Sequence, residues 1–400
     1  MLAPSGNLDP AGPTVICGDV MNFGFTEEQE MLRESARKFL EAECPTAFVR
    51  KMMEHETAHS AKLWKKLADL GWLGLLIPQS LGGMGGGVLD ASVIVEEMGK
   101  ALLPGPFLAT VLLGGVAVGA GGSAAQKKEV LPRIAEGSAV LTLAFVEDPA
   151  SHDAAEIEFE AKRKGRDYVL RGEKLFVFDA AVADWIVVAA RTASAKKRPQ
   201  HGITLFLVER GAPGLSITPL ATVDKTRRQA NLTFDRVSVP AERVLGRVDQ
   251  GWPILLRALQ IGTAALCVET VGAAQRALEL SVQYARERMQ FGKPIGSFQA
   301  VKHKCVDMMV AIENARSLSY YATWAVDARN RECAKAVAMA KAYTSDMGKN
   351  VTGDAIQVHG GIGFTWEHDI HLYYRRALAN EVTFGSAPLH REAVARQLSL

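Results

Sequence analysis

The stretch RERMQFGKPIGSFQA, residues 286–300, forms a corner between two long helical segments and decides how the second half of the chain folds. A helix carrying Arg286 and Arg288 is expected to end at Phe291 and Gly292, and a turn with Pro294 leads into a new helix near Ser297. A guanidinium at such a corner, that of Arg288, can donate two parallel hydrogen bonds to phosphate oxygens. A capped turn without any ligand is the alternative.

The spacing of hydrophobic residues divides the chain into three parts. From Trp252 onward it is Ala-rich, and Val301, Cys305, Met308, Ile312 and Ala315 recur every three or four positions, as in a bundle helix. Between about residues 140 and 240 the period changes to two, with Ile157, Phe159 and Ala161 alternating with charged residues. Before residue 140 the period is helical again, starting with a cap at Thr26. The order is therefore helical, strand-rich, helical.

Composition limits the class of protein. The 400 residues suggest two or three domains, and 48% hydrophobic with 22% charged residues is typical of a globular chain. A formal charge of +2 argues against nucleic-acid or membrane-surface binding, and the apolar run Phe107–Gly122 is shorter than the roughly 20 residues of a membrane span. Five scattered cysteines without a CxxC pair indicate a reduced, cytoplasmic protein.

Two motifs that can indicate ligand binding also have explanations without a ligand. His55-Glu-Thr-Ala-His59 is a literal HExxH, but it lies between two predicted helices with no third ligand in view, so we expect a solvated segment and no metal site. The glycines at 360–363 follow an amphipathic helix and supply neither GxGxxG nor a P-loop. Their backbone amides can admit a polyanion or cap the helix, and the sequence leaves both readings open.

Five ordered segments together resemble the acyl-CoA dehydrogenase family of FAD-dependent enzymes that desaturate acyl-CoA thioesters. They are FTEEQEMLRESARKFL (25–40), LGWLGLLIPQSLGGMGGG (70–87), FDRVSVPAERVLGRVDQGW (234–252), ERMQFGKPIGSFQAVKHK (287–304) and AIQVHGGIGFTWEHDIHLYYRR (355–376).

The resemblance implies an α+β multidomain fold. After a flexible extension (1–20) we expect an N-terminal helical domain (21–139), a central β-barrel-like domain (140–248) and a C-terminal four-helix bundle (249–400). It also implies FAD as cofactor, an acyl-CoA substrate, and electron-transferring flavoprotein or a similar electron acceptor.

In this family FAD lies at a subunit interface, and one half of the site matches. The pyrophosphate and adenine half falls on Arg288, Phe291, Gln299, Gln357, Gly360 and Gly361. The half that touches the flavin ring does not match: Val146 and His152 replace a Thr and a Ser, and Phe176-Val-Phe178 replaces TrpIleThr. We expect the side-chain hydrogen bonds of this half to be lost.

The catalytic base does not match either. Removing an α-proton while the β-hydrogen leaves as hydride requires a carboxylate beside the α-carbon. The two family positions for it fall on Phe384 and Gly262, so no catalytic residue is predicted. Glu269 is seven residues from Gly262, about 10 Å along a helix, and Glu381 is expected to point elsewhere.

Three hypotheses follow. The first is a base-lacking subunit of a heteromeric acyl-CoA dehydrogenase that completes an FAD site in trans, with a second family subunit as partner. The second is a self-sufficient homotetrameric enzyme that uses an unrecognised carboxylate such as Glu381. The third is a structural or assembly subunit without flavin contact.

Overall fold

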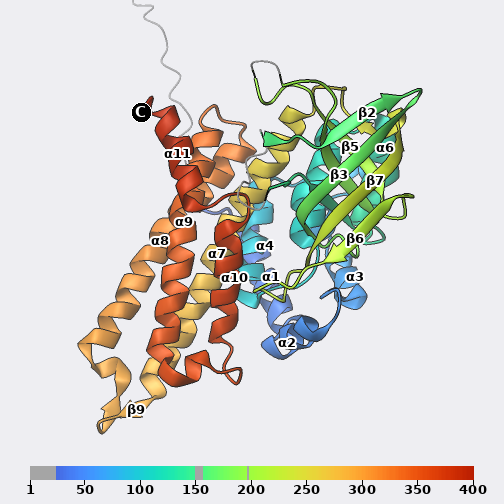
Figure 1. Cartoon of the computed structure of the whole chain (residues 1–400). Coiled ribbons are helices and arrows are strands. Elements are labelled where there is room, and N and C mark those ends of the chain that lie inside the picture. Colours follow the sequence, from blue (N-terminus) through green and yellow to red (C-terminus); the bar gives the residue numbers. More distant parts are fainter. Residues whose placement is uncertain (1–23, 149–155, 196–197) are drawn as a thin grey trace, which may run out of the picture.

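The computed structural model describes residues 24–148, 156–195 and 198–400. His152 and the predicted extension 1–20 lie outside the described residues. Figure 1 shows helices first in the chain, then a sheet, then a bundle of long helices, so the predicted order is confirmed.

Short helices form the N-terminal part. Thr26 caps the first of them with a complete capping box to Gln29, as the sequence predicts. The apolar run Phe107–Gly122 is helical and begins as a π-helix, Leu108–Gly114, in which every residue is buried. The α-helices are α1 Glu27–Glu43, α2 Thr46–Glu54, α3 Ala61–Asp69, α4 Val88–Ala101, α5 Gly115–Gly121 and α6 Ala124–Ala135.

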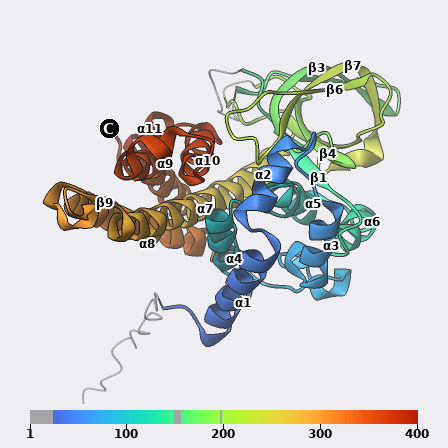
Figure 2. The same cartoon turned by 90° about the horizontal axis from the view of Figure 1, so that it is seen from below.

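The middle part is one mixed sheet of eight strands in the order β6-β7-β3-β2-β4-β5-β8, with β1 parallel to β4. Figure 2 looks along this sheet and shows it curled into a barrel-like shape. The predicted alternation is confirmed, since Ile157, Phe159 and Ala161 are buried. The strands are β1 Leu141–Ala144, β2 Glu160–Lys164, β3 Asp167–Phe178, β4 Trp185–Arg191, β5 Ile203–Glu209, β6 Leu215–Pro219, β7 Gln229–Pro240 and β8 Val244–Leu245.

Long helices form the C-terminal part: α7 Trp252–Glu287, α8 Gln299–Asp327, α9 Cys333–His359, α10 Ile370–Val382 and α11 Ala387–Gln397. The corner between α7 and α8 is a tight hairpin of β9 Met289–Gln290 and β10 Lys293–Pro294. On α8, Met308, Ile312 and Ala315 are buried, as their spacing predicts.

Helices α4 and α7 cross in backbone contact, because each has a glycine at the crossing. A Cβ atom on Gly99 would lie 2.1 Å from the Glu269 carbonyl oxygen, and one on Gly272 would lie 2.0 Å from that of Glu96. Any side chain at either position would separate the two helices.

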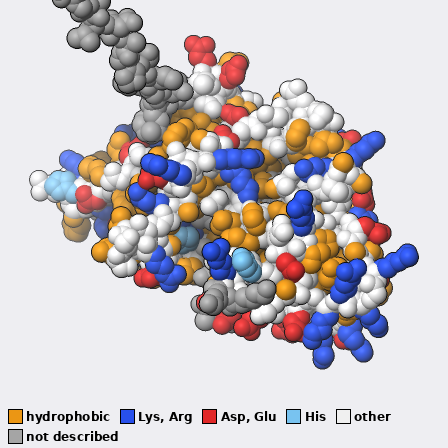
Figure 3. Space-filling view, turned by 90° about the horizontal axis from the view of Figure 1, so that it is seen from above, with side chains coloured by type: hydrophobic (Ala, Val, Ile, Leu, Met, Phe, Trp, Pro, Cys, Tyr) orange, Lys and Arg blue, Asp and Glu red, His pale blue; other side chains and the backbone are white. Residues whose placement is uncertain are grey.

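Of the described helices, α7 is long and apolar enough to cross a bilayer, but 72% of its apolar window is buried inside the protein. It is thus placed as the central helix of the bundle. On the face in Figure 3, basic and acidic side chains lie interspersed among hydrophobic ones, in keeping with the small net charge.

Candidate functional site

The six residues predicted to hold FAD gather at one end of the bundle. Arg288 directly follows α7, and Gln299 begins α8. Gln357 lies in the last turn of α9, and Gly360 and Gly361 follow in the 3-10 turn η7, Gly360–Phe364. Two contacts hold these ends together: the Tyr284 ring stacks on His359 at 4.6 Å, and Lys304 pairs with Asp354 at 2.5 Å.

This end of the bundle has the chemistry that a pyrophosphate needs. Arg288 is exposed, and among the described residues no side chain pairs with its guanidinium. Gly360 has a left-handed φ of 63°, and a Cβ on either Gly360 or Gly361 would meet nothing within 4 Å. The backbone there faces open space, so an anion can approach it closely. The residues therefore fit the group that the resemblance implies.

The flavin-side residues lie far from this end. Val146 follows β1, and Phe176 and Phe178 are at the end of β3. Figures 1 and 2 both show the sheet and the β9 hairpin on opposite sides of the molecule. A single chain therefore does not bring the two halves of the predicted site together.

The two positions predicted for the base face each other. A Cβ on Gly262, in α7, would lie 3.4 Å from Cε2 of Phe384, which follows α10. The Phe384 ring is 7% exposed and packs against Phe145 and Phe178, with ring centroids 6.3 and 6.2 Å apart. We call Phe145, Phe178, Phe384 and Gly262 the aromatic cluster.

Leu113, in the π-helix, adds a further apolar side chain to the aromatic cluster. A Cβ on Gly262 would come within 2.5 Å of Leu113 Cδ2. Phe145 and Phe178 are 6% and 8% exposed. Because rings in contact leave no layer for another group between them, apolar side chains fill the space between the two predicted base positions.

An unusual turn aims Phe384 into this cluster. Phe384 has a φ of 59° and Gly385 a φ of 99°, two successive left-handed residues. The Nε2–H of His390 donates to the Phe384 carbonyl at 2.9 Å and holds the turn. Burial lowers the pKa of His390 to about 4, so the imidazole is neutral in this role.

The two carboxylates considered as substitutes are both engaged. Glu269 is buried and accepts from Arg227 at 2.6 Å and from Arg376. Burial raises the pKa of Glu269, but these two guanidiniums outweigh it and the net shift is downward. Glu381 pairs with Lys349 at 3.2 Å on α9. Neither carboxylate is free to take a proton from a substrate.

Asp179 is the one group near the aromatic cluster that sequence reasoning missed. It follows Phe178, is 2% exposed, and neither of its carboxylate oxygens has a hydrogen-bond partner among the described residues. Burial raises its pKa to about 7, against the attraction of Arg227 and Arg376. An acidic residue within the apolar run FVFDAAV was the available signal.

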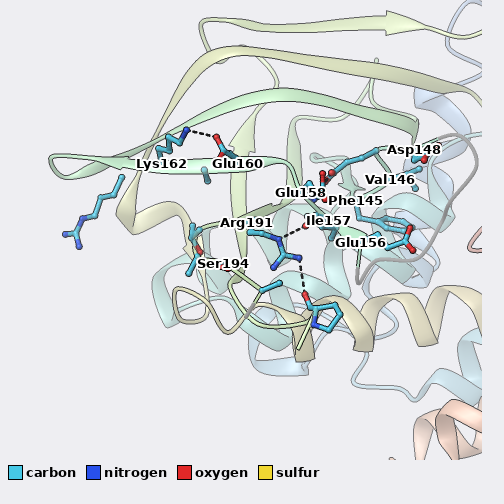
Figure 4. A pocket seen from close by; sticks show the side chains of 17 residues that line it. Phe145, Val146, Asp148, Glu156, Ile157, Glu158, Glu160, Lys162, Arg191 and Ser194 are labelled. Carbon is cyan, nitrogen blue, oxygen red and sulfur yellow. Dashed lines mark hydrogen bonds and ion pairs between the residues drawn. The ribbon is translucent and has the colours of Figure 1, made fainter. Parts of the chain in front are cut away.

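A cavity of about 1450 Å³ opens beside Phe145 and Val146 (Figure 4). Arg191 spans part of its wall, donating to the carbonyls of Ile157 at 2.6 Å and Pro199 at 3.0 Å. Its described lining has more carboxylates than cations: Glu147, Asp148, Glu156, Glu158 and Glu160 against Lys162, Arg163 and Arg191. The excess of negative charge does not favour a polyanion.

The HExxH segment forms a turn between α2 and α3, so its two imidazoles do not share a helix face. His59 packs edge-on against Trp64 instead, at 5.8 Å. Within the described ranges, no group of three His, Cys, Asp or Glu side chains is arranged to hold a metal.

The N-terminal helices, the sheet and the bundle make up an FAD-dependent dehydrogenase fold, and the residues predicted to hold FAD lie at one end of the bundle. Family models of the acyl-CoA dehydrogenase N-terminal, middle and C-terminal domains match residues 26–138, 142–237 and 249–399. The chain belongs to the acyl-CoA dehydrogenase family, whose members are FAD flavoproteins and oxidoreductases.

Relatives support this assignment over the whole length. A probable acyl-CoA dehydrogenase of Bacillus subtilis (strain 168) is 34% identical, covering 94% of this chain and 100% of its own. Butyryl-CoA dehydrogenase from Megasphaera elsdenii superimposes with a TM-score of 0.87 at 29% identity, covering 95% and 100%. A chain of the ChsE4-ChsE5 complex from Mycobacterium tuberculosis gives 0.86 at 29% identity, covering 95% and 99%.

Proposed function

We propose that this chain is the base-lacking subunit of a heteromeric acyl-CoA dehydrogenase and completes an FAD site in trans. The observation that carries the proposal is the aromatic cluster, in which both expected base positions meet without a carboxylate and apolar side chains fill the space between them. A general base typically contributes about 10²–10⁴ in rate, so a chain without one depends on another subunit for turnover.

The residues at the end of the bundle supply this chain's contribution. Bound FAD would supply the hydride acceptor for the substrate's β-hydrogen. Arg288 would donate charge-assisted hydrogen bonds to the pyrophosphate, and Gly360 and Gly361 would let backbone amides approach it. Phe291, Gln299 and Gln357 would flank the same group. Val146, Phe176 and Phe178 offer no side-chain hydrogen bond to a flavin ring in the chain's own half-site.

Exposed apolar side chains support a partner at this end. Phe291, one of the predicted FAD residues, is 90% exposed. Phe364 and Trp366, which shortly follow Gly361, are 74% and 54% exposed. Large exposed apolar groups of this kind mark interfaces. The solved ChsE4-ChsE5 complex names two components, which is the assembly that we propose for this chain. We place the complex in the cytoplasm, with electron-transferring flavoprotein or a similar protein as electron acceptor.

The test is the flavin-to-chain ratio of the purified protein, alone and co-expressed with a candidate partner subunit. We expect little FAD without the partner and stable FAD with it. Arg288→Ala should weaken the affinity of the complex for FAD at least tenfold and so lower its FAD content. Arg286 is an exposed arginine on the last turn of α7, and Arg286→Ala should leave the FAD affinity unchanged. Unchanged FAD in Arg288→Ala would instead favour the assembly-subunit hypothesis.

Asp179 favours a second candidate, the self-sufficient homotetramer. A buried carboxylate with a pKa of about 7 and no partner among the described residues has the properties of a general base. Full FAD occupancy of the chain alone, with flavin bleaching by an acyl-CoA that Asp179→Asn abolishes, would establish this candidate and refute the first. The single-subunit preparation is therefore the decisive sample.

A further inference from the structure

A second pocket lies away from the aromatic cluster, between the N-terminal helices and α7. Its volume is about 250 Å³, and its wall is mostly apolar, including Ile77, Val111, Val116, Leu131, Ile134 and Ile261. Ile261 precedes Gly262 on α7, but Gly262 faces Leu113 and Phe384, which do not line this pocket. The pocket is thus separate from the predicted base positions, and ligand binding there is independent of the proposed function.

Two arginines, Arg257 and Arg329, also line this pocket. Arg257 is half-buried and donates to the Val326 carbonyl at 2.5 Å. Arg329 is exposed, and no hydrogen bond or ion pair of its side chain is found among the described residues. Burial, followed by repulsion from Arg329, lowers the pKa of Arg257. The two guanidiniums therefore lie close enough to repel each other, and the carboxylate of Asp327, which also lines the pocket, offsets part of this charge.

The nearby carboxylate of Asp327 is already occupied. Its oxygens accept from the backbone N–H groups of Val88 at 2.9 Å and Leu89 at 3.4 Å, at the start of α4. A Cβ on Gly87 would lie 2.5 Å from Asp327 Oδ2, so the glycine lets this carboxylate reach the helix end. Because Asp327 caps α4, an excess of positive charge remains at the pocket.

We propose that this pocket binds a medium-chain aliphatic carboxylate, with the alkyl chain in the apolar slot and the carboxylate between Arg257 and Arg329. A volume of about 250 Å³ holds roughly eight groups of the size of a water molecule. Apolar burial favours the chain, and charge-assisted hydrogen bonds from two guanidiniums favour an anionic head over a neutral or cationic one.

The wall of the pocket offers a variant that closes it without disturbing the fold. Gly119 lines the pocket on α5, and a Cβ there would meet nothing within 4 Å. Gly119→Leu therefore places a large side chain at the exposed edge of the slot without a clash, where it obstructs entry, and replaces a helical glycine by a better helix former. Gly211→Leu is the matched control, since Gly211 is exposed, lies outside this pocket and also has free space around its Cβ.

The test is isothermal titration calorimetry of the purified full chain with octanoate, octan-1-ol and octylamine. We expect 1:1 binding of octanoate, weaker binding of octan-1-ol and none of octylamine. Arg329→Gln should weaken octanoate binding about tenfold, Gly119→Leu should abolish it, and Gly211→Leu should preserve it. No octanoate binding at millimolar concentration, equal binding by Gly119→Leu, or equal affinity for octylamine would each overturn the proposal.

Discussion

At the scale of single residues, Arg376 joins all three parts of the chain. It is fully buried on α10 and donates to Asp224 at 2.5 Å, to Glu269 of α7, and to the Leu103 carbonyl at 3.4 Å. Asp224 belongs to the loop between β6 and β7, so one guanidinium connects bundle, sheet domain and N-terminal helices. Its charge is balanced only where these elements are docked.

Removing this guanidinium should therefore be costly. Arg376→Met leaves Asp224 buried without its guanidinium and Glu269 with Arg227 alone, and we expect a loss of about 3–5 kcal/mol in the free energy of unfolding. Urea denaturation measures it. Arg396→Ala, which breaks an exposed pair with Glu392, should cost less than about 0.5 kcal/mol. Equal effects of the two substitutions would mean that the buried network contributes nothing specific.

Asp179 predicts a dependence of stability on pH. Its folded pKa, about 7, lies above its ordinary value of 3.8, so between these pH values the folded chain binds the proton more tightly than the unfolded chain. The contribution of Asp179 to the free energy of unfolding therefore falls as pH rises from about 4 to 7, and it is fully lost above about pH 7. We expect Asp179→Asn to be more stable than the wild type by about 1–3 kcal/mol at pH 8, with no gain at pH 4.

Thermal unfolding across this pH range gives the comparison. Asp69→Asn is a suitable control, because Asp69 is an exposed carboxylate paired with Lys65 and should show no such pH-dependent gain. A constant difference between Asp179→Asn and the wild type at all pH values would contradict a titrating Asp179.

At the scale of elements, the glycine crossing of α4 and α7 sets the distance between two domains. Gly272→Ala places a methyl group where the Glu96 carbonyl oxygen now lies, and we expect it to cost about 1–3 kcal/mol by forcing the helices apart. Gly353→Ala, on α9, meets only Tyr374 Cε2 at 3.6 Å and should be neutral or slightly stabilising. Chemical denaturation of both variants tests this, and a Gly272→Ala variant as stable as Gly353→Ala would exclude a tight crossing.

The elements themselves were largely predictable, because their periods are local. The Thr26 cap, the alternation from Ile157 to Ala161 and the spacing on α8 each specify their element within a few residues. The sheet continues past residue 240, where the period of two ends in the sequence, because β8 pairs with β5. That pairing joins residues about forty positions apart and has no local signal.

The arrangement of the candidate site was not predictable from the sequence. Counting along the chain nominates Phe384 and Gly262, yet their contact depends on how α7 packs against the turn after α10. The isolation of Asp179 is equally non-local, since an unpaired carboxylate is defined by what surrounds it in space. The pocket with Arg257 and Arg329 combines residues from six separate segments, so the spacing of residues in the sequence does not predict it.

At the scale of the whole molecule, the outer face of α8 indicates a further contact surface. Val306, Met309 and Val310 are 52%, 57% and 55% exposed. Met309 and Val310 lie one helical turn after Val306, so the three side chains share one face of α8. We expect Met309→Glu to reduce the mass of the assembly, because a charge at an apolar contact is not solvated. Met31→Glu, at a 72% exposed methionine on α1, should leave the mass unchanged. Light scattering after size-exclusion chromatography measures both, and an unaltered mass for Met309→Glu would show that this face stays in water.

The left-handed turn at Phe384 and Gly385 has a consequence for how this chain can change. The backbone there fixes the direction of the side chain through the His390 hydrogen bond, independently of which group it carries. An acid in place of that ring would enter the aromatic cluster on the same turn, without rebuilding a loop. In the base-lacking subunit that we propose, the turn therefore keeps a base position one exchange away.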